Sequence, residues 1–213
     1  ELFYYKQVEG ILRGGAPGGY FGYNESQAAV LSFAVWSPLL MSAWVVWGLI
    51  FGWNYYSPIL CNLICLMAGM AAFGWLAKPS RRQTVTIAVL FMLFTPFTRF
   101  IMSCMPETFC CALVLWYMGA LLACVGACRE RYLWQMFAIA GFLTLMRPYF
   151  ILLFFYPVVL LGRYGKVKRI AAAGGSVLFI GGYTVLKKLF STDYLFDAME
   201  LPFLQTLREQ GLR

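Results

Sequence analysis

Long apolar runs recur along this chain, and short basic segments separate them. A helix of about 20 apolar residues is long enough to cross the hydrocarbon core of a bilayer. The runs lie at 57–77, 84–104, 107–127, 133–147, 149–162 and 170–190. The chain is 62% hydrophobic and 12% charged, whereas a soluble domain carries about 25% charged residues. We therefore expect an all-α, polytopic bundle of about six transmembrane helices.

The basic residues fall mainly in the short connections between these runs. They are Lys78, Arg81, Arg82, Arg129, Arg131, Arg163, Lys166, Lys168 and Arg169. Short loops rich in Lys and Arg stay on the cytoplasmic side. If 133–147 and 149–162 formed one kinked helix, the third basic loop would fall on the opposite side from the first two. Two short spans that meet at Arg147-Pro148 place all three basic loops on one side, and we adopt that arrangement.

The net charge of +8 raises the question of a nucleic-acid partner. Nucleic-acid binding uses a basic surface, often with interleaved aromatic residues, whereas these basic residues sit at the ends of apolar runs. We expect the lipid bilayer as a partner and no nucleic acid. The seven cysteines and the absence of histidine show no ligand spacing typical of a thiolate metal site, so the cysteines are interpreted as small packing residues.

Another apolar run, over 37–53, has a different character. Pro38 opens it and Gly52 closes it. Its Trp residues favour the membrane–water interface, and if it spanned the membrane, the residues before it would be cytoplasmic. We interpret it as an interfacial juxtamembrane helix. Residues 1–56 then form an external loop region that opens with an amphipathic helix, 57–191 form the bundle, and 192–213 begin a second external segment.

The few carboxylates are almost absent from the basic loops. Glu1, Glu25 and Glu107 fall on the predicted external side, where a carboxylate can accept a proton or hold a divalent ion such as Mg²⁺ or Mn²⁺. These three are the candidate catalytic residues. The candidate substrate-binding residues on that side are Arg99, Arg147, Tyr5, Tyr23, Asn24 and Lys187.

Arginines beside carboxylates at one membrane face suggest chemistry on a phosphate-bearing substrate, because a guanidinium binds phosphate with two parallel hydrogen bonds. Arg99 and Arg147 are the strongest of these candidates, because they lie inside or beside apolar runs, where charge is costly and often functional. Two structural alternatives remain open. Arg99 and Glu107 can form an ion pair across a turn, and Lys187 can reach the lipid headgroups without binding substrate.

Four stretches of this sequence resemble a known family. Glu1-Leu2-Phe3-Tyr4-Tyr5 resembles an external motif of the form Asp-Glu-x-x-Tyr that has lost its leading Asp. Trp36-Ser37-Pro38-Leu39-Leu40, running to Phe51-Gly52-Trp53-Asn54, resembles a juxtamembrane helix that opens at Pro-Pro-Leu or Lys-Pro. A span and a basic loop follow, and Arg99 and Glu107 then match an Arg and an acidic residue at the next external turn.

The family with these features is the GT-C superfamily of membrane glycosyltransferases, in the branch of protein O-mannosyltransferases and aminoarabinose transferases. The resemblance covers most of the chain and is specific in its N-terminal half. This chain departs from the pattern in three places: the leading Asp is not present, Ser-Pro replaces Pro-Pro, and Glu107 replaces the more usual Asp. From its first residue and the truncated motif, we expect a fragment of a longer protein, inactive alone.

The resemblance implies transfer of a sugar from a polyprenyl-phosphate-linked donor to an acceptor on the non-cytoplasmic side. It implies an integral protein of the bacterial plasma membrane, with Glu107 orienting the acceptor or a metal ion. It also implies that Arg99 and Arg147 hold the donor phosphate. Two other classes remain in view: a multi-span transporter or flippase for an anionic or lipid-linked substrate, and a non-catalytic scaffold in which Arg99 and Glu107 only hold helices together.

Overall fold

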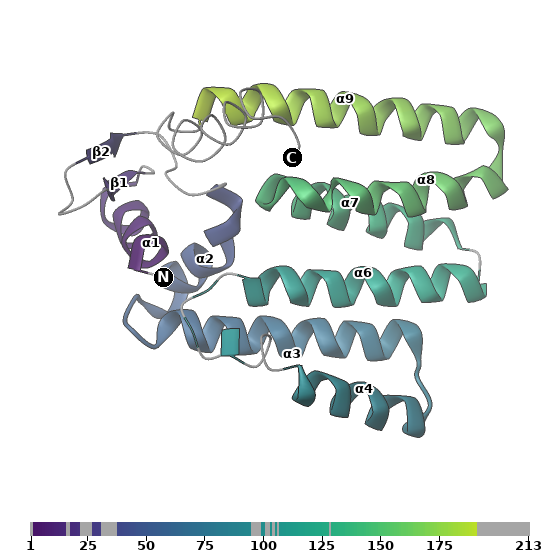
Figure 1. Ribbon diagram of the computed structural model, residues 1–213, viewed down its shortest axis with the longest axis horizontal. Helices are drawn as coiled ribbons and strands as arrows, with labels where there is room; N and C mark the ends of the chain where they lie inside the picture. Colours follow the sequence, from purple (N-terminus) through teal and green to yellow (C-terminus); the bar gives the residue numbers. More distant parts are fainter. Residues whose placement is uncertain are drawn as a thin grey trace, which may run out of the picture.

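The computed structural model describes residues 2–15, 18–21, 27–30, 38–94, 99–100, 103, 105, 107–127 and 129–190. These residues are predominantly helical, as the apolar runs predict. Figure 1 shows long helices lying side by side, with the N-terminal elements gathered at one end of the row.

The helices of the row are α3 (Ser57–Ala77), α4 (Arg81–Leu93), α6 (Glu107–Ala127), α7 (Glu130–Met146), the 3₁₀ helix η3 (Pro148–Phe154), α8 (Phe155–Leu161), the 3₁₀ turn η4 (Gly162–Tyr164) and α9 (Lys166–Phe190). Helices that follow one another along the row run in opposite directions, except that η3 continues into α8 in the same direction (Figure 1). Within the described residues, three helical segments are long and apolar enough to cross a membrane: Ser57–Ala77, Glu107–Gly126 and Lys166–Leu186.

The run expected at 84–104 is not one continuous helix. Helix α4 has 13 residues and ends at Leu93. The sequence supplies a reason, because Pro96 follows closely and a proline disfavours the helical conformation of the residue before it. At its start, α4 has a complete capping box, in which Ser80 accepts from the backbone N–H of Gln83 and the Gln83 side chain accepts from that of Ser80.

The predicted break at Arg147-Pro148 is present. Helix α7 ends at Met146, and Arg147 has an extended backbone with φ −143° and ψ 121°. Pro148 then begins η3, which continues into α8. Because the chain reverses at this point, the two short segments are antiparallel neighbours rather than one kinked helix.

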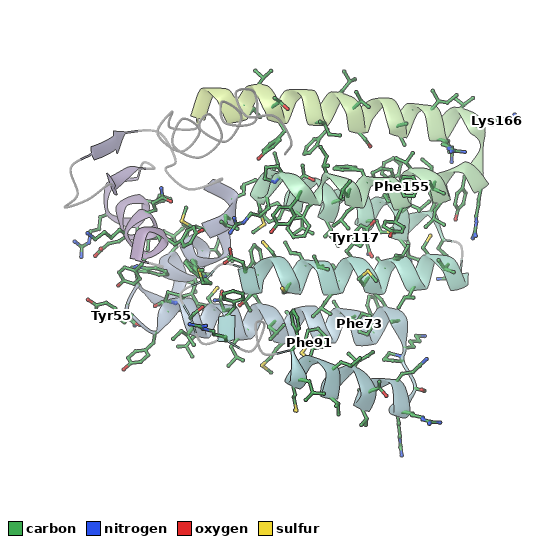
Figure 2. All side chains as sticks on the ribbon, viewed as in Figure 1. Tyr55, Phe73, Phe91, Tyr117, Phe155 and Lys166 are labelled. Atoms are coloured by element: carbon green, nitrogen blue, oxygen red, sulfur yellow. The ribbon has the colours of Figure 1, made fainter. Side chains whose placement is uncertain are left out.

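This reversal brings the three basic connections to the same end of the row. They join α3 to α4, α6 to α7 and α8 to α9, and all three lie at the end marked by Lys166 in Figure 2. Helices α1 and α2 lie at the opposite end, marked by Tyr55. The molecule therefore has one basic end and one end that carries the N-terminal elements.

The N-terminal elements are α1 (Leu2–Gly14), a hairpin of β1 (Gly18–Phe21) and β2 (Gln27–Val30), the 3₁₀ turn η2 (Pro38–Met41) and α2 (Ser42–Phe51). The hairpin is antiparallel, with Gly18 opposite Val30, and sequence reasoning did not anticipate it. The helix expected over 37–53 is present as η2 and α2. It ends before Gly52, whose φ of 82° suits a residue without a side chain.

Helices α3 and α6 approach each other closely. A Cβ added at Gly69 would lie 2.5 Å from the backbone oxygen of Ala112, so only glycine fits at that crossing. Small residues at such contacts let the backbones of membrane helices pack together. Farther along the bundle, the Tyr117 hydroxyl donates to the backbone oxygen of Leu153, at 2.6 Å, and ties α6 to η3.

Candidate functional site

A partly buried ion pair joins the start of α6 to the end of α7. Arg147 follows the last residue of α7, and Glu107 is the first residue of α6. Their side chains are in direct contact, and they are 8% and 26% exposed. A carboxylate at the start of a helix is favoured by the helix dipole. Because α6 and α7 are antiparallel and joined by a short turn, the start of one lies beside the end of the other.

Tyr4 of α1 covers this pair. Its side chain is buried, and its hydroxyl accepts a hydrogen bond from the Arg147 guanidinium. Burial raises the pKa of Tyr4 above its usual value of 10, and the nearby carboxylate of Glu107 adds to that rise, while the charge of Arg147 opposes it. The phenol is therefore neutral at physiological pH and is able to donate its proton in a hydrogen bond.

Gln7 lies one turn farther along the same helix. Residues three apart are neighbours on a helix surface, so Gln7 and Tyr4 share a face of α1. Gln7 is 1% exposed, and neither its amide nitrogen nor its amide oxygen has a hydrogen-bond partner among the described residues. The same holds for Oε2 of Glu107. Buried polar groups normally have hydrogen-bond partners. Groups without such a partner are typical of a place where a polar ligand or water binds.

A second buried polar group, Asn62, connects the elements around the ion pair. Asn62 of α3 is fully buried; its Oδ1 accepts from Nε1 of Trp44, in α2, at 2.9 Å. Its amide nitrogen donates to the backbone oxygen of Met105, also at 2.9 Å. Asn62 thereby links α3 to α2 and to Met105, which lies two positions before Glu107. A site whose neighbours are held in this way keeps its geometry.

The structure brings two of the predicted site residues together. Glu107 and Arg147 are in contact, and the described partner of Glu107 is Arg147, whereas the Arg99 side chain is exposed. Tyr5 stacks on Tyr55 with ring centroids 5.5 Å apart and lies 5.1 Å from Trp53, so it forms part of an aromatic cluster beside α2.

The remaining predicted residues lie outside what the structure describes. Glu1, Tyr23, Asn24 and Glu25 fall outside the described residues, as does the segment 192–213. Lys187 belongs to α9, but its side chain is not among those described. Their predicted roles stay predictions.

Sequence reasoning missed Tyr4, Gln7 and Asn62 as site residues. Signals for them were present. Tyr4, Gln7 and Val8 have the i, i+3, i+4 spacing of one helix face, and a glutamine on an otherwise apolar face is unusual. Asn62 is a polar residue within the apolar run 57–77, which is itself a sign of a structural or functional role.

The described residues do not supply a divalent-cation site. They contain no group of three or more His, Cys, Asp or Glu side chains placed to hold a metal ion. In addition, the positive guanidinium of Arg147 lies against Glu107 and would repel a cation there. A role for Mg²⁺ or Mn²⁺ would depend on carboxylates outside the described residues.

A comparison with protein-family models found no match, and searches of curated proteins and of solved structures found none either. The functional interpretation therefore depends on the residues and their arrangement.

Proposed function

We propose that this protein is a membrane glycosyltransferase, which moves a sugar from a polyprenyl-phosphate-linked donor to an acceptor at the non-cytoplasmic surface. One observation carries the proposal: the Arg147–Glu107 pair, covered by Tyr4, lies at the end of the bundle opposite the three basic loops. Basic loops mark the cytoplasmic side, so the pair faces the other side. The motif resemblance described above supports the same activity.

In this proposal Arg147 binds the donor phosphate. A guanidinium is permanently charged and its fork matches phosphate oxygens, so a phosphate can replace the Glu107 carboxylate as its partner. The acceptor hydroxyl attacks the anomeric carbon, the bond from that carbon to the phosphate oxygen breaks, and polyprenyl phosphate leaves. Arg147 stabilises the charge that develops on the phosphate, a contribution that is often large in catalysis.

Glu107 has a second role once the phosphate is bound. Its carboxylate is released from Arg147 and is free to accept a hydrogen bond from the acceptor hydroxyl. Tyr4 contacts the guanidinium as a neutral phenol and helps to hold it in place. The resemblance implies that the acceptor proton goes to the Asp that the family carries immediately before the position of Glu1.

The test measures release of polyprenyl phosphate from a panel of polyprenyl-phosphate hexoses and pentoses by the full-length protein in membranes. We expect Arg147→Gln and Glu107→Gln each to lower the rate by about 10²-fold or more, the size of effect seen when one electrostatic contact to the transition state is removed. Arg129→Gln, a charge change at the opposite end, is the matched control and should keep wild-type activity. If neither site variant slows release while the protein stays folded, the proposal is wrong.

Transport is the alternative function. Transporters bind their substrates near the bilayer midplane on broken helices, whereas the break at Arg147 lies at one end of the described bundle. A flippase would carry the labelled donor to the other leaflet intact. The same assay separates the two functions, because only a transferase breaks the sugar–phosphate bond.

A further inference from the structure

A groove of about 690 Å³ lies on the side of the bundle, between α7 and α9. Helix α7 lines it from Glu130 to Leu145, α9 lines it from Lys168 to Phe179, and residues of α8 and η3 form its floor. The groove is separate from the Arg147–Glu107 pair, since neither residue lines it.

The walls of the groove are apolar, and small residues make room in it. Gly141, Ala172 and Gly175 line it together with several Phe side chains. Ser176 is one of its polar lining residues, but its hydroxyl donates to the Ala172 backbone oxygen of the same helix at 2.8 Å. The interior therefore suits a hydrocarbon chain rather than a polar ligand.

One end of the groove is charged. Lys168 and Glu130, one from each wall, form an ion pair at 2.8 Å. Both belong to the basic end of the molecule, where the α8–α9 connection adds further Lys and Arg residues (Figure 2). Trp134 lines the same end and is 60% exposed. Trp is enriched at the membrane–water boundary, so the charged end lies at the headgroup level.

The length of the groove matches one leaflet. From Lys168 to Phe179, α9 advances by about 16 Å at roughly 1.5 Å per residue. One leaflet contributes about 15 Å to a hydrocarbon core that is roughly 30 Å thick. A chain that starts at the basic end thus reaches about the bilayer midplane.

We propose that this groove binds one acyl chain of an anionic phospholipid from the leaflet that faces the basic loops. The headgroup lies at Lys168 and the neighbouring basic residues, which attract anionic lipids, and the chain lies against the small residues of α7 and α9. This site requires α9 to span the bilayer, but it does not depend on sugar transfer.

The test uses neighbouring residues of α9 as matched pairs. Gly175 lines the groove and Gly174 does not, and a Cβ added at either would meet nothing within 4 Å. Gly175→Leu therefore places a bulky side chain in the groove from a position where a Cβ is tolerated, and Gly174→Leu is its control. Ala172→Leu and Ala173→Leu form a second pair, of which only the first enters the groove. The second pair serves if a Gly175 variant fails to fold.

The measurement is native mass spectrometry of the delipidated full-length protein, titrated with phosphatidylglycerol and with phosphatidylcholine of the same chains. We expect the wild type, Gly174→Leu and Ala173→Leu to bind phosphatidylglycerol preferentially, and the groove-filling variants to bind it at least ten-fold more weakly. Lys168→Gln should reduce the preference for phosphatidylglycerol, whereas Arg81→Gln, at the same end but on α4, should not.

Three results would overturn the proposal. The first is equal binding of phosphatidylglycerol by folded Gly174→Leu and Gly175→Leu. The second is a bound polyprenyl phosphate, instead of a phospholipid, that the wild type and Gly174→Leu retain and Gly175→Leu loses. The third is a dimer mass that only the groove-filling variants abolish, since that would mean a second copy of the chain occupies the groove.

Discussion

Arg147 carries a positive charge on a side chain that is only 8% exposed, so it depends on its partners. Removing one member of a buried pair leaves the other charge without compensation, and the usual cost is about 3 to 5 kcal/mol. Replacing both members with neutral groups of similar size costs far less. This difference allows the structural role of the pair to be measured apart from any activity.

We expect Glu107→Gln to lower the free energy of unfolding by about 2 to 3 kcal/mol, below the usual range because Glu107 is a quarter exposed. The double variant Glu107→Gln/Arg147→Met should recover most of that loss. Denaturant titration in mild detergent measures both, and a double variant as unstable as the sum of the single variants would show that the two side chains are not coupled.

The hydrogen bonds of Asn62 allow a second prediction about stability. Replacing it with Leu leaves the Trp44 N–H and the Met105 carbonyl without their partner in a buried place, which costs about 1 to 3 kcal/mol for each group. The thermal unfolding temperature should fall markedly. Trp44→Phe removes the indole N–H that Asn62→Leu would leave without a partner. The Asn62→Leu/Trp44→Phe double variant should therefore lose less stability than the sum of the two single variants. Strictly additive losses would argue against the contact.

Among the elements, the crossing of α3 and α6 is where a described glycine lies closest to backbone atoms of another helix. A Cβ at Gly69 would lie 2.5 Å from the Ala112 oxygen, whereas one at Gly74, on the same helix, would meet nothing within 4 Å. Backbone atoms cannot move aside as a flexible side chain can, so an added methyl group must separate the helices.

Gly69→Ala should therefore destabilise the protein by about 1 to 3 kcal/mol, the usual cost of overpacking. Gly74→Ala should be neutral or slightly stabilising, since alanine favours helix more than glycine does. The comparison uses the unfolding temperatures of the two variants in the same detergent. If Gly69→Ala is as stable as Gly74→Ala, the helices do not pack as the structure describes.

At the scale of the whole molecule, the two ends of the bundle differ in chemistry, and this difference makes topology measurable. We propose that the end with α1 and α2 faces away from the cytoplasm. Single cysteines placed on a cysteine-free background at the exposed positions Arg13 and Tyr55 should react with an impermeant thiol reagent in intact cells. Cysteines at Ser80 and Lys166, near the basic connections, should react only after the membrane is opened.

Labelling of Ser80 and Lys166 but not of Arg13 and Tyr55 would reverse the orientation and rule out transfer on the non-cytoplasmic side. Labelling of one residue from each end would instead contradict the arrangement of the helices, because α1 and Tyr55 lie at one end of the row and the α3–α4 and α8–α9 connections lie at the other (Figures 1 and 2).

Much of the helical framework was predictable, because hydropathy, proline position and loop charge are properties of local sequence. The segments 57–77 and 107–127 match α3 and α6, and the break at Arg147-Pro148 follows from the effect of proline on the preceding residue. The short α4 was not predictable from hydropathy, since apolar residues continue past Leu93. The hairpin was not predicted because the glycines of β1 and the alanines of β2 have weak strand propensity.

The sequence by itself determined most of the helical segments, which end of each is basic, and that Glu107 and Arg147 belong to the same end. Only the tertiary structure decided that these two residues, 40 positions apart, are in contact, and that Tyr4 covers them. Ion-pair choice depends on distances of a few ångströms between side chains of different helices. Those distances follow from how α1, α6 and α7 pack, and no local property of the sequence contains that information.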